Sequence, residues 1–132
     1  MSILTIIIAA LITTIVWFVA GAVVYMNPPV AKVFKKYQKH PSMKSWGTQG
    51  KYLWNTFLIA GLIPNILIAI VFIILAPISW VTFALILFAV RIVPRGCDMY
   101  MQTSYPNKLL VIEMVNGLIL SFVTAYMLSL FI

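Results

Sequence analysis

The chain begins with an apolar run that holds no charged side chain from Ile3 to Tyr25. A helix needs about 20 mostly apolar residues to cross the roughly 30 Å of hydrocarbon in a bilayer. A soluble fold of 132 residues could not cover such a run together with the rest of its apolar surface. The run therefore predicts a membrane-spanning helix. We expect it to be retained, because no Lys or Arg precedes it as in a signal peptide.

Three further apolar runs predict three more spans. The chain is 64% hydrophobic and only 8% charged, whereas a soluble domain has about 25% charged residues. The four spans predicted within one membrane domain, 1–132, are 3–25, 53–76, 78–93 and 109–132. The third run, ended by Pro94, is slightly short for a span, so a re-entrant segment is the alternative. The predicted fold class is all-α, with four transmembrane helices and one interfacial amphipathic helix.

The interfacial helix is predicted at the start of the first of two basic stretches, 26–52 and 94–108. Asn27 can cap this helix, and Pro41 stops it. The apolar residues with helical spacing on one face are Val30, Val33, Phe34 and Tyr37. The lysines of the stretch are Lys32, Lys35, Lys36, Lys39, Lys44 and Lys51. A short helix of this kind lies in the headgroup plane with its apolar face down.

The basic residues also predict the orientation in the membrane. Four spans place both basic stretches on the same side, whereas three spans would place them on opposite sides. The positive-inside rule assigns the basic side to the cytoplasm, or to the matrix of an organelle, and both termini to the other side. We expect contacts with anionic lipid headgroups, worth about 1 kcal/mol each near the surface, from Lys32, Lys35, Lys36, Lys39 and Arg95. Because the bilayer explains the charge of +7, we expect no nucleic-acid partner.

Glu113 and Arg91 are the sharpest candidates for an intramembrane polar site. Each lies about one turn inside its span, counted from the same membrane face, so an ion pair between them is geometrically reasonable. A charged group inside the bilayer is costly and indicates function by default. The functional interpretations are a proton or ion path and an anchor for a polar ligand. The alternatives are a structural ion pair near the interface and an Arg91 side chain that snorkels to lipid phosphate.

Two asparagines complete the candidate polar site. Asn65 follows Pro64 midway along the second span. We expect it to hydrogen-bond the carbonyl that the proline frees, although it could line a site at a broken helix instead. Asn116 belongs to a face of small and polar residues on the fourth span, which comprises Asn116, Gly117, Ser121, Thr124 and Ala125. Such faces predict close helix packing, with a polar cleft as the alternative.

The residues needed for most enzyme chemistry are missing from the sequence. Cys97 is the single cysteine, His40 the single histidine, and Asp98 and Glu113 the two acids. A catalytic triad, a pair of carboxylates at suitable spacing and a His/Cys metal site are therefore excluded within one chain. We expect no catalytic residues, no cofactor and no metal, and we rank a lipid-active membrane enzyme last among the functions.

The end of the first span, Gly21-Ala-Val-Val-Tyr25-Met-Asn-Pro28, resembles a family of small, mainly bacterial four-span membrane proteins catalogued as a domain of unknown function. Those proteins have a Gly, an aromatic pair with Tyr, and a Pro at this place, followed by a basic-aromatic stretch comparable to Lys32-Val-Phe34. The start of the last span, near Tyr105-Pro106, is loosely similar too. The resemblance implies a four-helix fold and membrane residence, and it carries no activity.

These features favour an accessory or scaffolding subunit of a membrane protein assembly. Small-residue helix faces and few titratable groups suit lateral packing against other membrane proteins or against a second copy of the chain. The alternative is a small oligomeric transporter or channel with Glu113 and Arg91 near the path. The expected partners are therefore the lipid bilayer with its anionic headgroups and other membrane subunits.

Overall fold

The structure, a computed structural model, describes residues 2–37, 39–41 and 49–132, and these ranges contain helices and short turns without a strand. The first span is α1 (Ile3–Met26), followed by the short α2 (Pro28–Lys36). The second span joins α3 (Gln49–Asn55), η1 (Thr56–Leu62) and α4 (Ile63–Leu75). The third span joins α5 (Trp80–Leu87), η2 (Phe88–Ile92) and α6 (Val93–Gln102), and the fourth is α7 (Asn107–Phe131). Four helices are thus long and apolar enough to cross a membrane, which confirms the predicted fold class.

Polar side chains mark where three of the helices begin. Ser2 accepts a hydrogen bond from the Thr5 amide at 3.2 Å, and Ser79 accepts one from the Thr82 amide at 3.1 Å. Asn27 accepts one from the Val30 amide at 3.2 Å, as expected for the cap of the short helix α2. These bonds satisfy amides of the first turn that have no partner within their own helix.

Both middle spans contain a π-helical segment just before a proline. η1 ends two residues before Pro64, and η2 ends two residues before Pro94. Proline has no N–H to donate to the carbonyl four residues earlier, and its ring collides with that carbonyl, so the helix widens. Pro94 therefore does not end the third helix as we expected. The helix continues to Gln102, so most of the expected loop 94–108 is helical and the third span has full membrane length.

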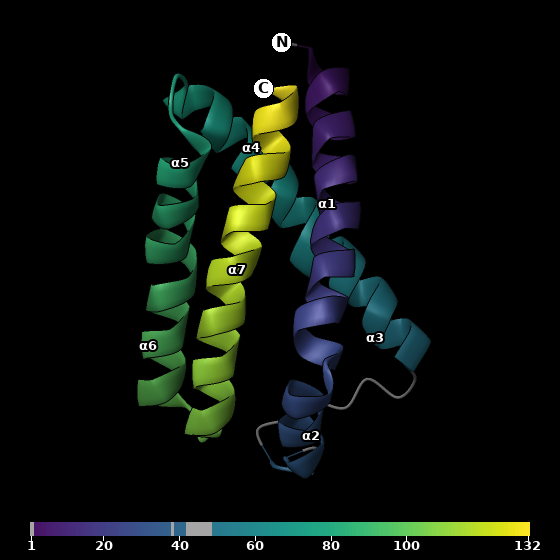
Figure 1. Ribbon diagram of the computed structural model, residues 1–132, viewed down its shortest axis with the longest axis vertical. Coiled ribbons are helices and arrows are strands. Elements are labelled where there is room, and N and C mark those ends of the chain that lie inside the picture. The colour runs from purple at the N-terminus through teal and green to yellow at the C-terminus, as the bar shows by residue number, and fades with distance from the viewer. Residues whose placement is uncertain (1, 38, 42–48) are drawn as a thin grey trace.

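The four spans form a bundle in which α7 is the central helix. α7 packs along both α1 and α5, and α4 packs on α1. Both termini lie at one end of the bundle, together with the turn between α4 and α5 (Figure 1). The apolar core is also at this end, where the rings of Phe72 and Phe83 lie 4.7 Å apart between centroids. Its buried members are Ala9, Ile68, Ala69, Phe72, Phe83, Ala84, Leu87, Ala125 and Leu128.

Small residues let the helices approach closely inside the bundle. A Cβ atom at Gly61 would lie 2.8 Å from the Trp17 ring, and one at Gly117 would lie 2.8 Å from the Ile92 side chain. The small-polar face of the fourth span is buried in the chain: Asn116, Gly117, Ser121, Thr124 and Ala125. The outer surface instead carries exposed aliphatic side chains such as Ile15, Leu67 and Val90. Lipid is the solvent that such a surface needs.

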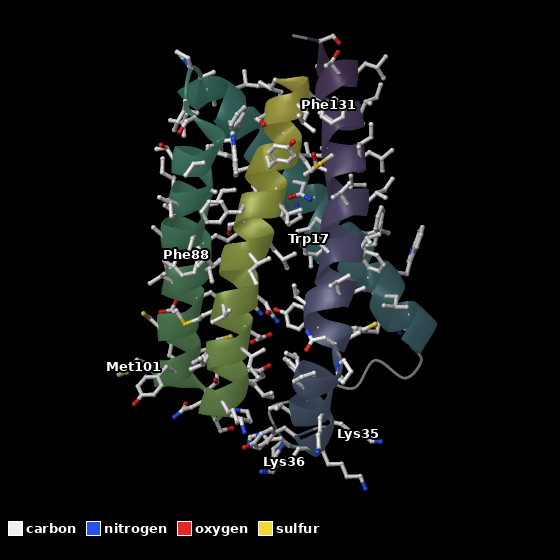
Figure 2. All side chains as sticks on the ribbon, in the orientation of Figure 1. Trp17, Lys35, Lys36, Phe88, Met101 and Phe131 are labelled. Atoms are coloured by element: carbon white, nitrogen blue, oxygen red, sulfur yellow. The ribbon has the colours of Figure 1, made fainter. Side chains whose placement is uncertain are left out.

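The basic residues gather at the end opposite the termini. Lys35 and Lys36 of α2 point outward there (Figure 2), and Lys32 is exposed as well. The apolar face of α2 is half-buried, and Phe34 packs edge-on against Tyr25 of α1 with ring centroids 5.7 Å apart. Part of this face therefore covers the end of the bundle itself. The stretch 42–48 of the expected basic loop, with Lys44, lies outside the described residues.

Candidate functional site

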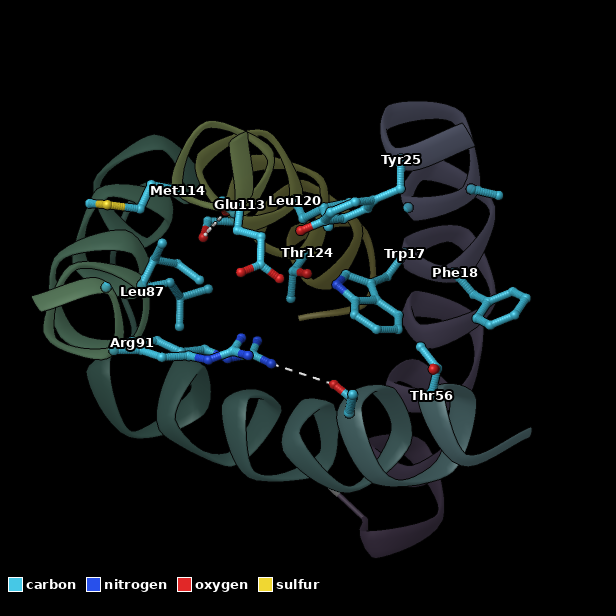
Figure 3. Close-up of a pocket in the computed structure, with 18 of the residues that line it drawn as sticks. Trp17, Phe18, Tyr25, Thr56, Leu87, Arg91, Glu113, Met114, Leu120 and Thr124 are labelled. Carbon is cyan, nitrogen blue, oxygen red and sulfur yellow. Dashed lines mark hydrogen bonds between the residues drawn. The ribbon is translucent and has the colours of Figure 1, made fainter. Parts of the chain in front are cut away.

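A pocket of about 860 Å³ lies between the four spans, in the half of the bundle next to the basic end. It extends from Phe34 and Met99 near that end to Leu87 and Thr124 deeper in the bundle. Its volume is within the roughly 300–1,000 Å³ that small-molecule sites occupy. Its polar and aromatic lining includes Trp17, Tyr25, Arg91, Arg95, Glu113 and Thr124. Figure 3 shows most of them around a common centre.

The pocket is present because the second and third spans diverge. They meet at the end where the rings of Phe72 and Phe83 touch, and α3 then leads away from α6 toward the basic end (Figure 1). Both π-helical segments lie along this divergence, and Thr56, Ala60 and Arg91 within them face the pocket. π-Helical turns are frequent at functional sites because they reposition side chains within a helix.

Arg91 crosses the pocket from η2 to η1. Its Nη2 donates a hydrogen bond to the Ala60 carbonyl at 3.4 Å, drawn as a dashed line in Figure 3. That carbonyl is the one four residues before Pro64, which has no amide hydrogen to offer it. We expected the Asn65 side chain in this role, and the structure corrects that expectation. The Asn65 amide donates instead to Thr14 Oγ1 at 3.0 Å.

Glu113 lies on the facing wall, on α7, and points into the pocket opposite Arg91 (Figure 3). In the part of the chain that the structure describes, no ion pair joins these two side chains, although they share the pocket as expected. The cation whose charge acts on the carboxylate is Arg95, one turn beyond Arg91. We predicted that Arg95 would contact lipid headgroups, and the structure places it in the pocket lining.

Tyr105 supports the Glu113 carboxylate from the turn before α7. The phenol donates a hydrogen bond to the carboxylate. Burial raises the pKa of Tyr105 above its usual value of 10.0, and the negative charge of Glu113 and this bond raise it further. The sequence placed Tyr105 next to Pro106 at the start of a span, but no local pattern could pair it with an acid eight residues later.

The two asparagines hold helices together around the pocket. Asn116 donates to the Val24 carbonyl at 3.3 Å and also hydrogen-bonds the Tyr25 side chain, so it joins α7 to α1. Asn65 is almost fully buried and joins α4 to α1 through Thr14. Neither side chain is part of the pocket lining. The four predicted polar residues thus separate into two that face the cavity and two that position its walls.

Aromatic residues contribute much of the pocket wall, and sequence reasoning missed their role. Tyr25, near the end of the first span, lines the pocket together with Trp17 and Tyr52. Trp17 and Tyr25 lie eight residues apart on α1, which is close to two helical turns and hence one face. This spacing was visible in the sequence, but only the placement of α7 shows which face is internal.

The described residues show which chemistry this arrangement permits. No three His, Cys, Asp or Glu side chains gather among them as a metal ion would need. The pocket instead combines apolar and aromatic walls with two guanidinium groups and one carboxylate. This combination suits the binding of a molecule that has both apolar and charged parts.

Comparisons with protein-family models, with curated proteins and with solved structures found no match for this chain. The family resemblance at Gly21–Pro28 therefore stays a prediction.

Proposed function

We propose that this chain is a small membrane carrier that binds an amphipathic molecule in the pocket between its four spans. The observation that supports this proposal is the convergence of Arg91, Arg95 and Glu113 on a cavity whose lining is mainly apolar and aromatic. Charged groups are expensive within a bilayer and are retained where they serve a ligand or a path.

The shape of the pocket also supports a carrier. The cavity reaches the basic end of the bundle, while the opposite end is filled by the buried apolar core. A site open toward one side and closed toward the other is what one state of an alternating-access carrier requires. The two π-helical segments with their following prolines are suitable hinges, because they interrupt the regular helix beside the cavity. Arg91 then serves as a tether between the two hinged spans.

The accessory-subunit role has less support on the surface of the chain. We expected small-residue faces to pack against partners, but the face on α7 is buried against other helices of the same chain. Gly61 and Gly117 likewise contact side chains of neighbouring spans. A scaffolding role remains a proposal for which isolation of the chain with defined partner subunits is the test.

A pocket-filling substitution tests the carrier proposal. Gly21 lines the cavity, and a Cβ atom added there meets no atom within 4 Å. Gly21→Leu should therefore occupy the binding space without disturbing the helix, since Leu is also a better helix former than Gly. Gly50→Leu is the matched control, because Gly50 has equally open surroundings and is not part of the pocket lining.

The measurement is native mass spectrometry of the chain extracted gently from its membrane. The wild type and Gly50→Leu should retain one lipid-sized or smaller amphiphile, and Gly21→Leu should lose it while keeping its helical circular dichroism. Equal retention by all three chains would contradict the proposal, because the bound molecules would then lie on the outer surface.

A further inference from the structure

We propose that the ligand of this pocket carries a zwitterionic headgroup, with an anionic group for Arg91 and Arg95 and a protonated amine for Glu113. The inference rests on the proposed carrier function and names the class of molecule that it serves. A single-chain lipid with a phosphate and a primary amine represents this class.

The charges of the pocket are separated between two walls. Arg91 and Arg95 both come from the third span, four residues apart and hence about one helical turn. Glu113 comes from α7 on the facing side, and Figure 3 shows the Glu113 and Arg91 side chains directed toward the same space. The cavity keeps them from closing into an ion pair. A ligand with both charges would partner both walls at once.

Arg91 and Glu113 each have a partner that leaves room for a ligand. Arg91 makes one long hydrogen bond, 3.4 Å, to a backbone carbonyl, and a guanidinium has further N–H groups to offer. Glu113 accepts from Tyr105, and a carboxylate can accept several more hydrogen bonds. Two arginines one turn apart suit a phosphate, since guanidinium groups bind phosphate oxygens in pairs. A protonated amine offers the donors that the remaining carboxylate oxygen lone pairs accept.

The rest of the cavity is suited to an apolar tail. Beyond the charged groups the lining consists mainly of large apolar side chains, among them Trp17, Leu87 and Leu120 (Figure 3). These residues lie toward the middle of the bundle, while Arg95 and Met99 lie toward the basic end. A bound lipid would therefore place its headgroup near the basic membrane face and its chain toward the closed end.

Three single-chain probes with the same fluorescent tail test the inference on the full chain in nanodiscs. Lysophosphatidylethanolamine carries both charges, lysophosphatidic acid lacks the amine, and an alkylamine lacks the phosphate. We expect the first probe to bind at least about tenfold more tightly than the other two, as one charge-assisted hydrogen bond implies. This comparison on the wild type needs no variant, so it holds even where a substitution impairs folding.

Variants that remove one charge test which side chain binds the amine of the headgroup and which bind its phosphate. Glu113→Gln should remove the preference for lysophosphatidylethanolamine over lysophosphatidic acid. Arg91→Gln and Arg95→Gln should remove the preference over the alkylamine. Asp98→Asn and Lys108→Gln are the matched controls, because both side chains are exposed and neither lines the pocket, and both should bind the three probes as the wild type does.

Two different results separate this inference from the proposed function. Equal affinity of the wild type for the zwitterionic probe and for either singly charged probe would overturn the zwitterion inference, while loss of binding in Gly21→Leu would still support the carrier. Failure of all three probes to bind the wild type, together with no effect of Gly21→Leu on retained amphiphile, would overturn both.

Discussion

Buried hydrogen bonds between individual side chains set how α1 meets its neighbours. Asn65 donates to Thr14 Oγ1 at 3.0 Å, and Thr14 itself donates to the Ala10 carbonyl at 2.7 Å. A short hydrogen-bonded chain thus runs from α4 to the backbone of α1. Thr13 beside it has a buried hydroxyl without a partner among the described residues. The polar contact between α4 and α1 is therefore made by the pair Asn65 and Thr14.

Removing this pair should loosen the contact between the first and second spans. Asn65→Leu and Thr14→Val should each lower the free energy of unfolding by about 0.6–2 kcal/mol, the range for interhelical hydrogen bonds in membranes. The measurement is unfolding in mixed detergent micelles, with the exposed Asn107→Ala as the control. The double variant should lose less than the sum of the single losses. Strict additivity would show that the two side chains do not act as a pair.

Tyr105 should report on its contact with Glu113 through its titration. Because the pKa of Tyr105 is raised in the folded chain and is about 10 in an unfolded one, this contribution to stability is present below pH 10 and is lost as the pH rises above it. The difference in tyrosinate absorbance between the wild type and Tyr105→Phe should have its midpoint above pH 10. Glu113→Gln should move that midpoint to lower pH. A midpoint at or below 10 in the wild type would contradict the contact.

At the scale of the helices, glycine decides how closely the spans approach. Gly61 lies against Trp17 and Thr14 of α1, so the second span meets the first with almost no space between backbone and ring. Gly21, on the same α1, faces the pocket and touches nothing at its Cβ position. Two glycines in adjacent spans thus have opposite surroundings, one at a tight crossing and one at a cavity.

Alanine substitutions should separate these two surroundings. Gly61→Ala should cost about 1–3 kcal/mol, as overpacking does, because its Cβ would lie 2.8 Å from the Trp17 ring. Gly21→Ala should leave stability unchanged or raise it by up to about 1 kcal/mol through better helix propensity. Thermal unfolding followed by circular dichroism measures both. If Gly61→Ala were as stable as the wild type, the crossing would be looser than the structure shows.

The elements were predictable where the signal is local. Apolar runs of membrane length predicted four spans. Asn27 and the helical spacing of the apolar residues after it predicted α2. These signals are local, because length, capping and periodicity depend only on neighbouring residues. The predicted end of the third span at Pro94 was wrong. A proline usually ends a helix, but here a π-helical segment precedes Pro94 and the helix continues beyond it. Whether a helix ends or widens at a proline depends on contacts with other helices, and the local sequence does not determine those contacts.

For the whole molecule, the basic residues and the termini lie at opposite ends of the bundle (Figures 1 and 2). The positive-inside rule applied to this arrangement predicts that the basic end faces the cytoplasm or matrix. The pocket would then open toward that compartment. The same arrangement makes the orientation testable with cysteine chemistry, because Cys97 is the single cysteine and is exposed near the basic end.

A membrane-impermeant maleimide should distinguish the two ends. Added outside intact cells or spheroplasts, it should leave native Cys97 unlabelled until the membrane is permeabilised. In a Cys97→Ser background, Ser79→Cys in the turn between α4 and α5 should be labelled without permeabilisation. Labelling in the reverse pattern would show that the basic end faces outward, against the predicted orientation.

The pocket was the part of the molecule that the sequence predicted least well. Glu113 and Arg91 could be placed at similar depth from the helix boundaries, but their separation across a cavity depends on the angle between spans. Arg95 was expected to contact lipid headgroups because it belongs to a basic stretch, and its place in the pocket lining could not be predicted from that stretch. Which side chains line the pocket depends on the central place of α7, a property of the assembled bundle.

The π-helical segments before Pro64 and Pro94 have a consequence for the register of each span. A π turn holds one residue more than an α turn, and each residue of an α-helix advances the helix by about 100°. Deleting a single residue from η1 should therefore restore a regular helix and rotate Tyr52 and Thr56 away from the cavity. The packing of α4 on α1 should stay unchanged. A one-residue shortening would thus change which side chains of the second span face the pocket, without substituting any residue.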